Sequence, residues 1–241
     1  MKFLLKYCYF SLFFLLAVSC GNRKNIGFHS KLNTLEGLDG RKIKIDSLEK
    51  FMAKEMDSLK IPAISIAIIN DHEIIFAENI GVKNLVTKEK VNKYNIFEAC
   101  SLSKPVFAYF VMTLAEKGII DIDKPLYQYY KENDIEPGKN YESLTARMIL
   151  CHASGFPNWR ESSEEKLLFL FPPGTRYGYS GEGYQYLARV LMHILKTDDK
   201  GLNALFQKEV ARPLGMHSMN FIWKKKSFPA KSILPRKRIT Y

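Results

Sequence analysis

A serine followed three residues later by a lysine is a pair that can do nucleophilic chemistry, and the chain contains this pair three times. The pairs span Ser47–Lys50, Ser101–Lys104 and Ser163–Lys166. On a helix, residues three positions apart project from the same face, so the amine lies within reach of the hydroxyl proton. The first and third pairs lie in charged, amphipathic stretches, where a hydrated amine stays protonated and accepts no proton. Only the pair at Ser101 opens a strongly apolar segment, where burial disfavours the charged amine and the helix N-terminus favours a developing negative charge.

The residue pattern gives little support to a metal site, a nucleotide-binding site or a Ser-His-Asp triad. The cysteines and histidines form no cluster at metal-ligand spacing, and there is no glycine-rich phosphate loop, so no metal or cofactor is expected. The stretch Gly178–Glu182 approaches the Gly-x-Ser-x-Gly pattern of Ser-His-Asp hydrolases, but it carries glutamate at the fifth position. We interpret Cys100 and Cys151 as buried small apolar residues. The alternative is a disulfide between them, whose geometry the sequence does not test. His72 falls in a predicted turn and is expected to be solvated.

Four segments, taken in order, resemble those of one enzyme family. The first surrounds Ser101, the second is a His-x-Ser-Gly turn, the third carries tyrosines between glycines, and the fourth is a Pro-Leu-Gly-Met turn. They are similar to the nucleophile segment, the structural histidine turn, the catalytic-tyrosine segment and the turn closing the helical region in class C β-lactamases, DD-peptidases and related esterases. The segments are Asn95–Pro105, Leu150–Phe156, Pro172–Gly181 and Pro213–Met216.

The resemblance implies a role for each matched residue. Ser101 would attack an acyl carbonyl with Lys104 as proton acceptor. Tyr179 would assist proton transfer to the leaving group and then help to activate the deacylating water. His152, in the His-x-Ser-Gly turn, would be mainly structural. The family carries Tyr-x-Asn where this chain has Gly181 at the third position, so a side-chain amide that could hold the substrate or the lysine is missing.

A second departure from the family concerns the oxyanion hole. Family members carry Lys-Thr-Gly or His-x-Gly on a late strand, whose backbone amide joins the amide of the nucleophile. The sequence contains no Lys, His or Arg followed by Ser or Thr and then Gly, and the nearest fragment, Lys196–Asp198, lies at a predicted helix end. Losing one oxyanion donor typically costs about 10² to 10³ in rate. We therefore expect an incomplete sheet and interpret the chain as a truncated or frame-shifted product.

The elements that must position these residues indicate an α+β fold, which the resemblance makes β-lactamase/DD-peptidase-like: an antiparallel sheet packed by helices, plus a helical region. An amphipathic helix is predicted from Asp46, its expected cap, to Leu59. A hairpin follows, with strands at 63–69 and 73–77. The apolar period predicts a core helix over Ser101–Lys117, which a glycine ends. Shorter helices are predicted over 143–151, 164–171, 183–196 and 201–210.

The start of the chain reads as a targeting segment. Residues 1–19 resemble a signal peptide, because basic residues precede an apolar run that is too short to span a bilayer as a mature helix. The stretch Leu16–Cys20 resembles a bacterial lipobox, which makes Cys20 the expected lipidated N-terminus. A plain cleaved signal or an uncleaved anchor is the alternative. Residues 20–45 are then a polar tether, and the protein is expected in the bacterial cell envelope, attached to a membrane through its lipid.

The end of the chain is strongly basic. Residues 224–241 carry seven basic residues and no acidic one, and without them the formal net charge falls from +11 to +4. We expect the partial catalytic domain to cover 46–223 and this tail to be aberrant. A basic patch on anionic lipid or nucleic acid, or a solvated tail, is the alternative. No nucleic-acid partner is expected.

These observations together predict a serine hydrolase that acts through an acyl-enzyme. The expected substrate is a small acyl compound, which is a peptide amide, an ester or a β-lactam. Because the sequence lacks the motif of the late strand, the resemblance predicts the family's chemistry for the matched residues and not an active enzyme for this chain as it stands. The alternative is a non-catalytic envelope lipoprotein that binds peptidoglycan peptides or a partner protein.

Overall fold

The computed structural model describes residues 33–162 and 164–222. The predicted signal peptide, the lipidated Cys20 and the basic tail lie outside the described residues and stay predictions. The described chain forms two compact units, which divide between Lys93 and Tyr94. Each unit is described by itself.

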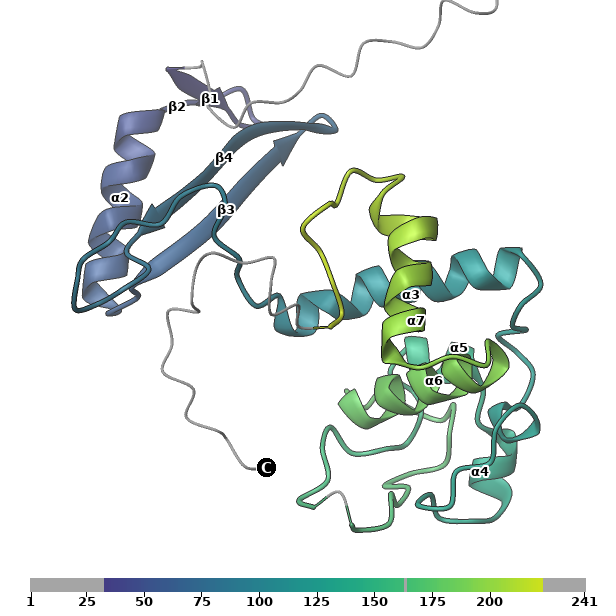
Figure 1. Cartoon of the computed structure of the whole chain (residues 1–241). Helices are drawn as coiled ribbons and strands as arrows, with labels where there is room; N and C mark the ends of the chain where they lie inside the picture. Colours follow the sequence, from purple (N-terminus) through teal and green to yellow (C-terminus); the bar gives the residue numbers. More distant parts are fainter. Residues whose placement is uncertain (1–32, 163, 223–241) are drawn as a thin grey trace, which may run out of the picture. The chain divides into compact units, whose positions relative to one another are not determined.

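Over residues 33–93, the described part of the first unit contains two antiparallel hairpins and one helix (Figure 1). The short strands β1 (Thr34–Glu36) and β2 (Lys42–Lys44) pair within the segment that we expected to be a tether. Helix α2 (Ile45–Ser58) follows, and then the longer hairpin of β3 (Ala63–Asn70) and β4 (Glu73–Gly81). The predicted hairpin is therefore present, and its turn residues take the positive φ angles that a tight hairpin turn requires.

Helix α2 packs on one face of the β3–β4 hairpin because both elements carry an apolar stripe. Met52 of α2 and Phe76 of β4 are buried, and alternate isoleucines of β3 pack against them. The predicted cap is wrong: the helix begins at Ile45, and Asp46 lies inside the first turn without capping it. Phe51 of α2 is 60% exposed, because a two-stranded sheet covers only a narrow strip of the helix.

The second unit is mostly helical, as the sequence predicted for this part of the chain. Its central element is α3, which follows directly on a 3₁₀ turn, η1. Four α3 side chains are buried, and Gly118 at φ +70° ends the helix as predicted. The helical elements are η1 (Cys100–Leu102), α3 (Ser103–Glu116), η2 (Leu126–Gln128), α4 (Lys139–Ser143), α5 (Ala146–Leu150), α6 (Gly181–Ile194), α7 (Asp199–Phe206) and the π-helix η3 (Gln207–Ala211).

One hydrophobic core joins α3 to α6, α7 and η3. Figure 1 shows the yellow-green helix α7 running across the teal helix α3. Phe110 of α3 meets Phe206 of α7 edge to face with ring centroids 5.8 Å apart, and both rings are fully buried. The core thus holds α3, and with it the Ser101 turn at its start, against the helices that follow in the chain.

The predicted helix over 164–171 is wrong. Leu167 forms a parallel bridge with Ile135 instead: its amide donates to the carbonyl of Asp134, and its carbonyl accepts from the amide of Glu136. These pairings between distant segments give both backbone polar groups of Leu167 a hydrogen-bond partner. The Leu167 side chain lies in the core and is 0% exposed. Local spacing that resembles a helix therefore loses to tertiary backbone pairing.

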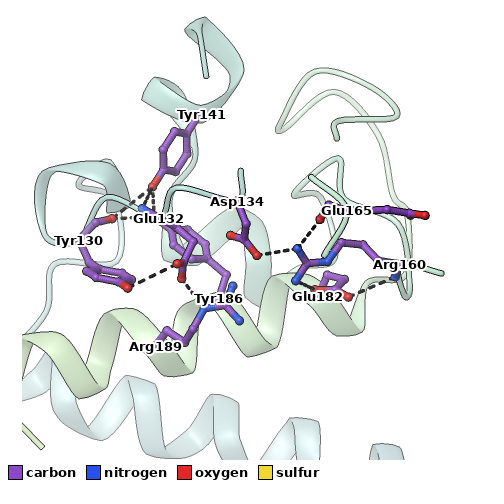
Figure 2. A network of polar contacts seen from close by, with 9 residues as sticks. All are labelled: Tyr130, Glu132, Asp134, Tyr141, Arg160, Glu165, Glu182, Tyr186 and Arg189. Atoms are coloured by element: carbon purple, nitrogen blue, oxygen red, sulfur yellow. Dashed lines mark hydrogen bonds and ion pairs between the residues drawn. The ribbon is translucent and has the colours of Figure 1, made fainter. Parts of the chain in front are cut away.

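Two neighbouring networks of ion pairs link α6 to the loops that pack beside it, as Figure 2 shows. Arg160 forms ion pairs with Asp134 at 2.5 Å and with Glu182 at 3.2 Å, and its side chain is only 10% exposed. Arg189 pairs with Glu132. Because these charges are largely removed from water, each needs its partners in place. Through Glu182 one network reaches the first turn of α6, and through Arg189 the other reaches the later part of the same helix.

No helix in the described ranges is long and apolar enough to cross a membrane. Residues 33–162 and 164–222 likewise contain no group of three or more acidic, histidine or cysteine side chains arranged to hold a metal ion.

Candidate active site

Ser101 lies in the 3₁₀ turn η1, immediately before α3, at the edge of an open cleft of about 650 Å³. Its hydroxyl is exposed, and Cys100 before it has a φ of +45°, which is rare for a residue with a side chain and typical of strained functional turns. All cleft residues belong to the second unit. They are Ala99, Cys100, Ser101, Leu102, Lys104, Pro105, Ala108, Leu150, His152, Tyr179 and Tyr184.

The cleft brings together the three residues that the sequence singled out. The Nζ atom of Lys104 lies 3.4 Å from the Oγ atom of Ser101, as expected for two residues three positions apart at a helix start. The Oη atom of Tyr179, 78 positions further along the chain, lies 2.8 Å from the same Oγ. The Lys104 amine also sits over the Tyr179 ring, 4.9 Å from its centroid. Two proton-transfer groups therefore converge on one hydroxyl.

The phenol of Tyr179 is electrostatically tuned toward its anionic form. Its hydrogen bond with Lys104 lowers the pKa of Tyr179 most, and its hydrogen bond with Ser101 lowers it further, against a small opposing effect of burial. A phenol with a lowered pKa is a better proton acceptor near neutral pH than an ordinary tyrosine. The geometry therefore gives Ser101 a second candidate base besides the lysine.

His152 holds the Tyr179 segment on both sides. Its carbonyl accepts from the amide of Gly178 at 2.7 Å, and its Nδ1 accepts from the amide of Ser180 at 3.2 Å. Its ring stacks on the Tyr179 ring with centroids 4.3 Å apart. An accepting Nδ1 must be unprotonated. Burial first, and the charge of Lys104 second, lower the pKa of His152 and so favour that form.

His152→Ala is expected to lower kcat by about 10- to 100-fold with a smaller change in KM, because Tyr179 loses its stacking partner and its segment loses an acceptor. His152→Asn keeps an acceptor oxygen near the position of Nδ1 and should recover part of that loss. Steady-state kinetics of the two variants check this. Equal losses in both would mean that the hydrogen bond to Ser180 does not matter.

The wild type and His152→Asn should also differ in how their stability depends on pH. Because the folded-state pKa of His152 is lowered, the stability from its neutral form is fully present above the unfolded pKa of about 6.5 and is lost as pH falls through the folded value. The wild-type Tm should therefore fall more steeply on acidification than that of His152→Asn. Thermal melts from pH 7.5 downward measure the difference.

Two glycines flank Tyr179, and each lies against an aromatic ring. A Cβ atom on Gly178 would come within 2.7 Å of the Phe171 ring, and one on Gly181 within 2.5 Å of the Trp159 ring. Gly181 stands where the family carries asparagine, so here the indole occupies the space into which that side chain would start. The sequence showed the glycine at position 181 but did not point to Trp159. The missing side chain at 181 was the only sequence feature that indicated a large neighbour there.

The two cysteines differ from our expectation. Both Cys100 and Cys151 are exposed free thiols, not buried apolar residues. Cys100 is turned outward by its positive φ at the cleft edge, and Cys151 ends the short helix α5. The fragment Lys196–Asp198 lies after α6, where Asp198 caps α7 through its side chain. This fragment therefore lies in the junction between α6 and α7.

A sequence model of one known family matches most of the chain. The family is described as Beta-lactamase, and the match covers residues 48–239, which includes most of the segment that we set apart as a basic tail. Penicillin-binding protein 4* of Bacillus subtilis (strain 168) is 27% identical over 165 residues, which are 60% of this chain and 35% of that protein. An unguisins hydrolase of Aspergillus violaceofuscus is 28% identical over 181 residues, 65% of this chain and 31% of that protein. The chain thus spans about a third of these relatives.

Solved structures share the fold. A penicillin-binding protein homologue from Pyrococcus abyssi, described as octameric, superposes with a TM-score of 0.60 at 24% identity, covering 72% of this chain and 44% of that one. A D-alanine carboxypeptidase from Burkholderia cenocepacia gives 0.58 at 22% identity, covering 71% and 48%. At these identities the likeness concerns the fold alone.

Proposed function

Given that the chain belongs to the β-lactamase family, whose members are serine hydrolases, we propose that it cleaves an acyl bond through a covalent intermediate on Ser101. The single observation that supports this most is the convergence of Tyr179 Oη at 2.8 Å and Lys104 Nζ at 3.4 Å on the Ser101 hydroxyl. Of the two Ser-x-x-Lys pairs that lie wholly within the described residues, those of Ser47 and Ser101, this is the one with a third, distant proton-transfer group on its serine.

The proposed reaction has two halves. In the first, Ser101 Oγ bonds to the acyl carbon while its proton passes to the Lys104–Tyr179 pair. The bond from that carbon to the leaving nitrogen or oxygen then breaks, and the pair returns the proton to the leaving group. In the second half, water gives a proton to the same pair and bonds to the acyl carbon. The ester to Ser101 breaks, the acid departs, and Ser101 recovers its proton.

The proposed substrates are amides, esters or β-lactams of small acyl groups. Two matched proteins are named for such reactions, a D-alanine carboxypeptidase and an unguisins hydrolase, and a third is named for binding penicillin. The open cleft on this chain has mostly apolar lining side chains around a few polar groups, which suits an acyl compound. The chain's proposed location is the cell envelope, where relatives of this kind act.

Covalent labelling tests the proposal directly. A fluorescent penicillin acylates the nucleophile by ring opening, and a fluorophosphonate phosphonylates it with loss of fluoride. Trypsin releases residues 94–117 as one peptide, because Lys104 precedes proline, and the Ser47 pair falls on the separate peptide 45–50. Mass spectrometry should find one adduct per chain, on 94–117, with fragmentation placing it on Ser101.

A folded protein that labels nowhere would overturn the hydrolase and favour the alternative, a non-catalytic envelope protein that binds peptidoglycan peptides. In that case equilibrium dialysis should detect binding of a D-Ala-D-Ala peptide without release of D-alanine. An adduct on 45–50 would equally contradict the assignment of Ser101.

A further inference from the structure

Trp159 is a large aromatic side chain left half exposed, at 49%, beside the Tyr179 segment. Its six-membered ring lies over Gly181, two residues after Tyr179, so closely that any side chain at position 181 would overlap it. A large, half-exposed aromatic beside the segment that carries Tyr179 is the kind of group that binds ligands, because it offers much apolar area with few rotatable bonds.

The loop that carries Trp159 is tied to the start of α6 by its backbone. The carbonyl of Asn158 accepts from the amides of Gly181 at 3.0 Å and of Glu182 at 3.1 Å. The hydroxyl of Ser180 donates to the carbonyl of Pro157 at 2.8 Å. Trp159 therefore moves with the segment that holds Tyr179.

Arg160 holds the other end of this loop, as Figure 2 shows. Its guanidinium contacts the Asp134 carboxylate at 2.5 Å, the Glu165 carbonyl at 2.9 Å and the Glu182 carboxylate at 3.2 Å. Its own amide donates to Glu182 at 3.2 Å. Buried charge pairs of this kind leave little freedom to the neighbouring residue. The exposed indole is thus held in advance of any ligand, which lowers the entropy cost of binding to it.

A second apolar surface lies on the other side of Tyr179. The Phe171 ring packs against Gly178, and its neighbour Leu170 is 63% exposed. Tyr179 is therefore flanked by aromatic rings at both neighbouring glycines. We propose that Trp159 is a substrate-binding residue, whose exposed surface takes an apolar or aromatic group of the compound that Ser101 attacks. This inference rests on the proposed function.

Three matched esters test the subsite by activity. Methyl acetate carries no large group, methyl phenylacetate carries a phenyl group on the acyl side, and benzyl acetate carries one on the leaving side. Trp159→Ala should lower kcat/KM about tenfold or more for at least one aromatic ester, while methyl acetate changes less than about threefold. Trp159→Phe should restore most of the loss. If methyl phenylacetate responds, Trp159 binds the acyl group of the substrate, and if benzyl acetate responds, it binds the leaving group.

Leu168→Ala is the matched control, because Leu168 is 52% exposed on the same loop region and has no proposed role. It should leave all three esters unchanged. Equal losses on all three esters in Trp159→Ala would mark Trp159 as merely structural, and no loss on either aromatic ester would also overturn the subsite.

Fluorescence tests binding without any chemistry. The sequence contains two tryptophans, Trp159 and Trp223. In a Ser101→Ala background, phenylacetate or benzyl alcohol should change the emission saturably, and acetate or methanol should not. Adding Trp159→Phe should remove the response while Trp223 remains as the background.

The two assays separate the failure of this inference from the failure of the proposed function. If the wild-type protein hydrolyses none of the esters but its Ser101→Ala variant still shows the Trp159 response, the subsite stands and the reaction does not. If hydrolysis occurs and neither assay distinguishes aromatic from small compounds, the subsite is wrong.

Discussion

Replacing Ser101 with alanine is expected to lower the turnover of any ester, amide or β-lactam that the protein hydrolyses by at least about 10⁴-fold. The reason is that no other hydroxyl occupies the point where Lys104 and Tyr179 converge, within 3.4 Å and 2.8 Å. A methyl group there can neither bond to the acyl carbon nor pass on a proton. The measurement is kcat on the best substrate together with loss of the covalent adduct.

Two serines provide matched controls for this change. Ser47→Ala removes the serine of another Ser-x-x-Lys pair on the exposed side of α2, and Ser103→Ala removes the nearest neighbouring hydroxyl on α3. Both should keep kcat within about threefold of the wild type. Turnover that survives in Ser101→Ala, with an unchanged thermal melt, would contradict the assigned nucleophile.

Lys104→Met is expected to lower kcat/KM by about 10²- to 10⁴-fold, the usual contribution of a positioned proton-transfer group. The variant keeps a long apolar side chain in the half-buried position but loses the amine on Ser101. It also loses the largest influence that lowers the pKa of Tyr179, so that pKa should rise. The fraction of Tyr179 that can accept a proton then grows only at higher pH, and the rising limb of the pH–rate profile should shift toward alkali.

Lys104→Arg separates the two proton acceptors. Arginine keeps a positive charge beside Tyr179 but cannot itself take up a proton. Activity well above that of Lys104→Met would assign the base to Tyr179, and activity as low as that of Lys104→Met would assign it to the lysine. Kinetic profiles from pH 6 to pH 10 measure this. Activity within tenfold of the wild type in Lys104→Met would contradict the whole arrangement.

The hairpin and the long helices could be predicted because their signals are local. Alternating isoleucines in residues 63–70 and apolar spacing in 103–116 specify which face each element buries. The prediction was wrong where a distant partner decided the outcome. Residues 164–171 are not helical because Leu167 pairs with the backbone near Ile135, and no feature of the local sequence encodes that pairing. The cysteines were predicted wrongly for a similar reason, since the exposure of Cys100 at the cleft edge and of Cys151 at the end of α5 depends on how distant segments pack.

The sequence by itself determined that Ser101 and Lys104 share one helix face, because a spacing of three residues places them there wherever the helix lies. It also determined, through segments in family order, that Tyr179 belongs with them. Only the tertiary structure decided that the Tyr179 oxygen reaches Ser101, that His152 clamps its segment and that Trp159 fills the space beside Gly181. Those contacts join residues tens of positions apart, and they arise from packing and buried charge, which no local spacing specifies.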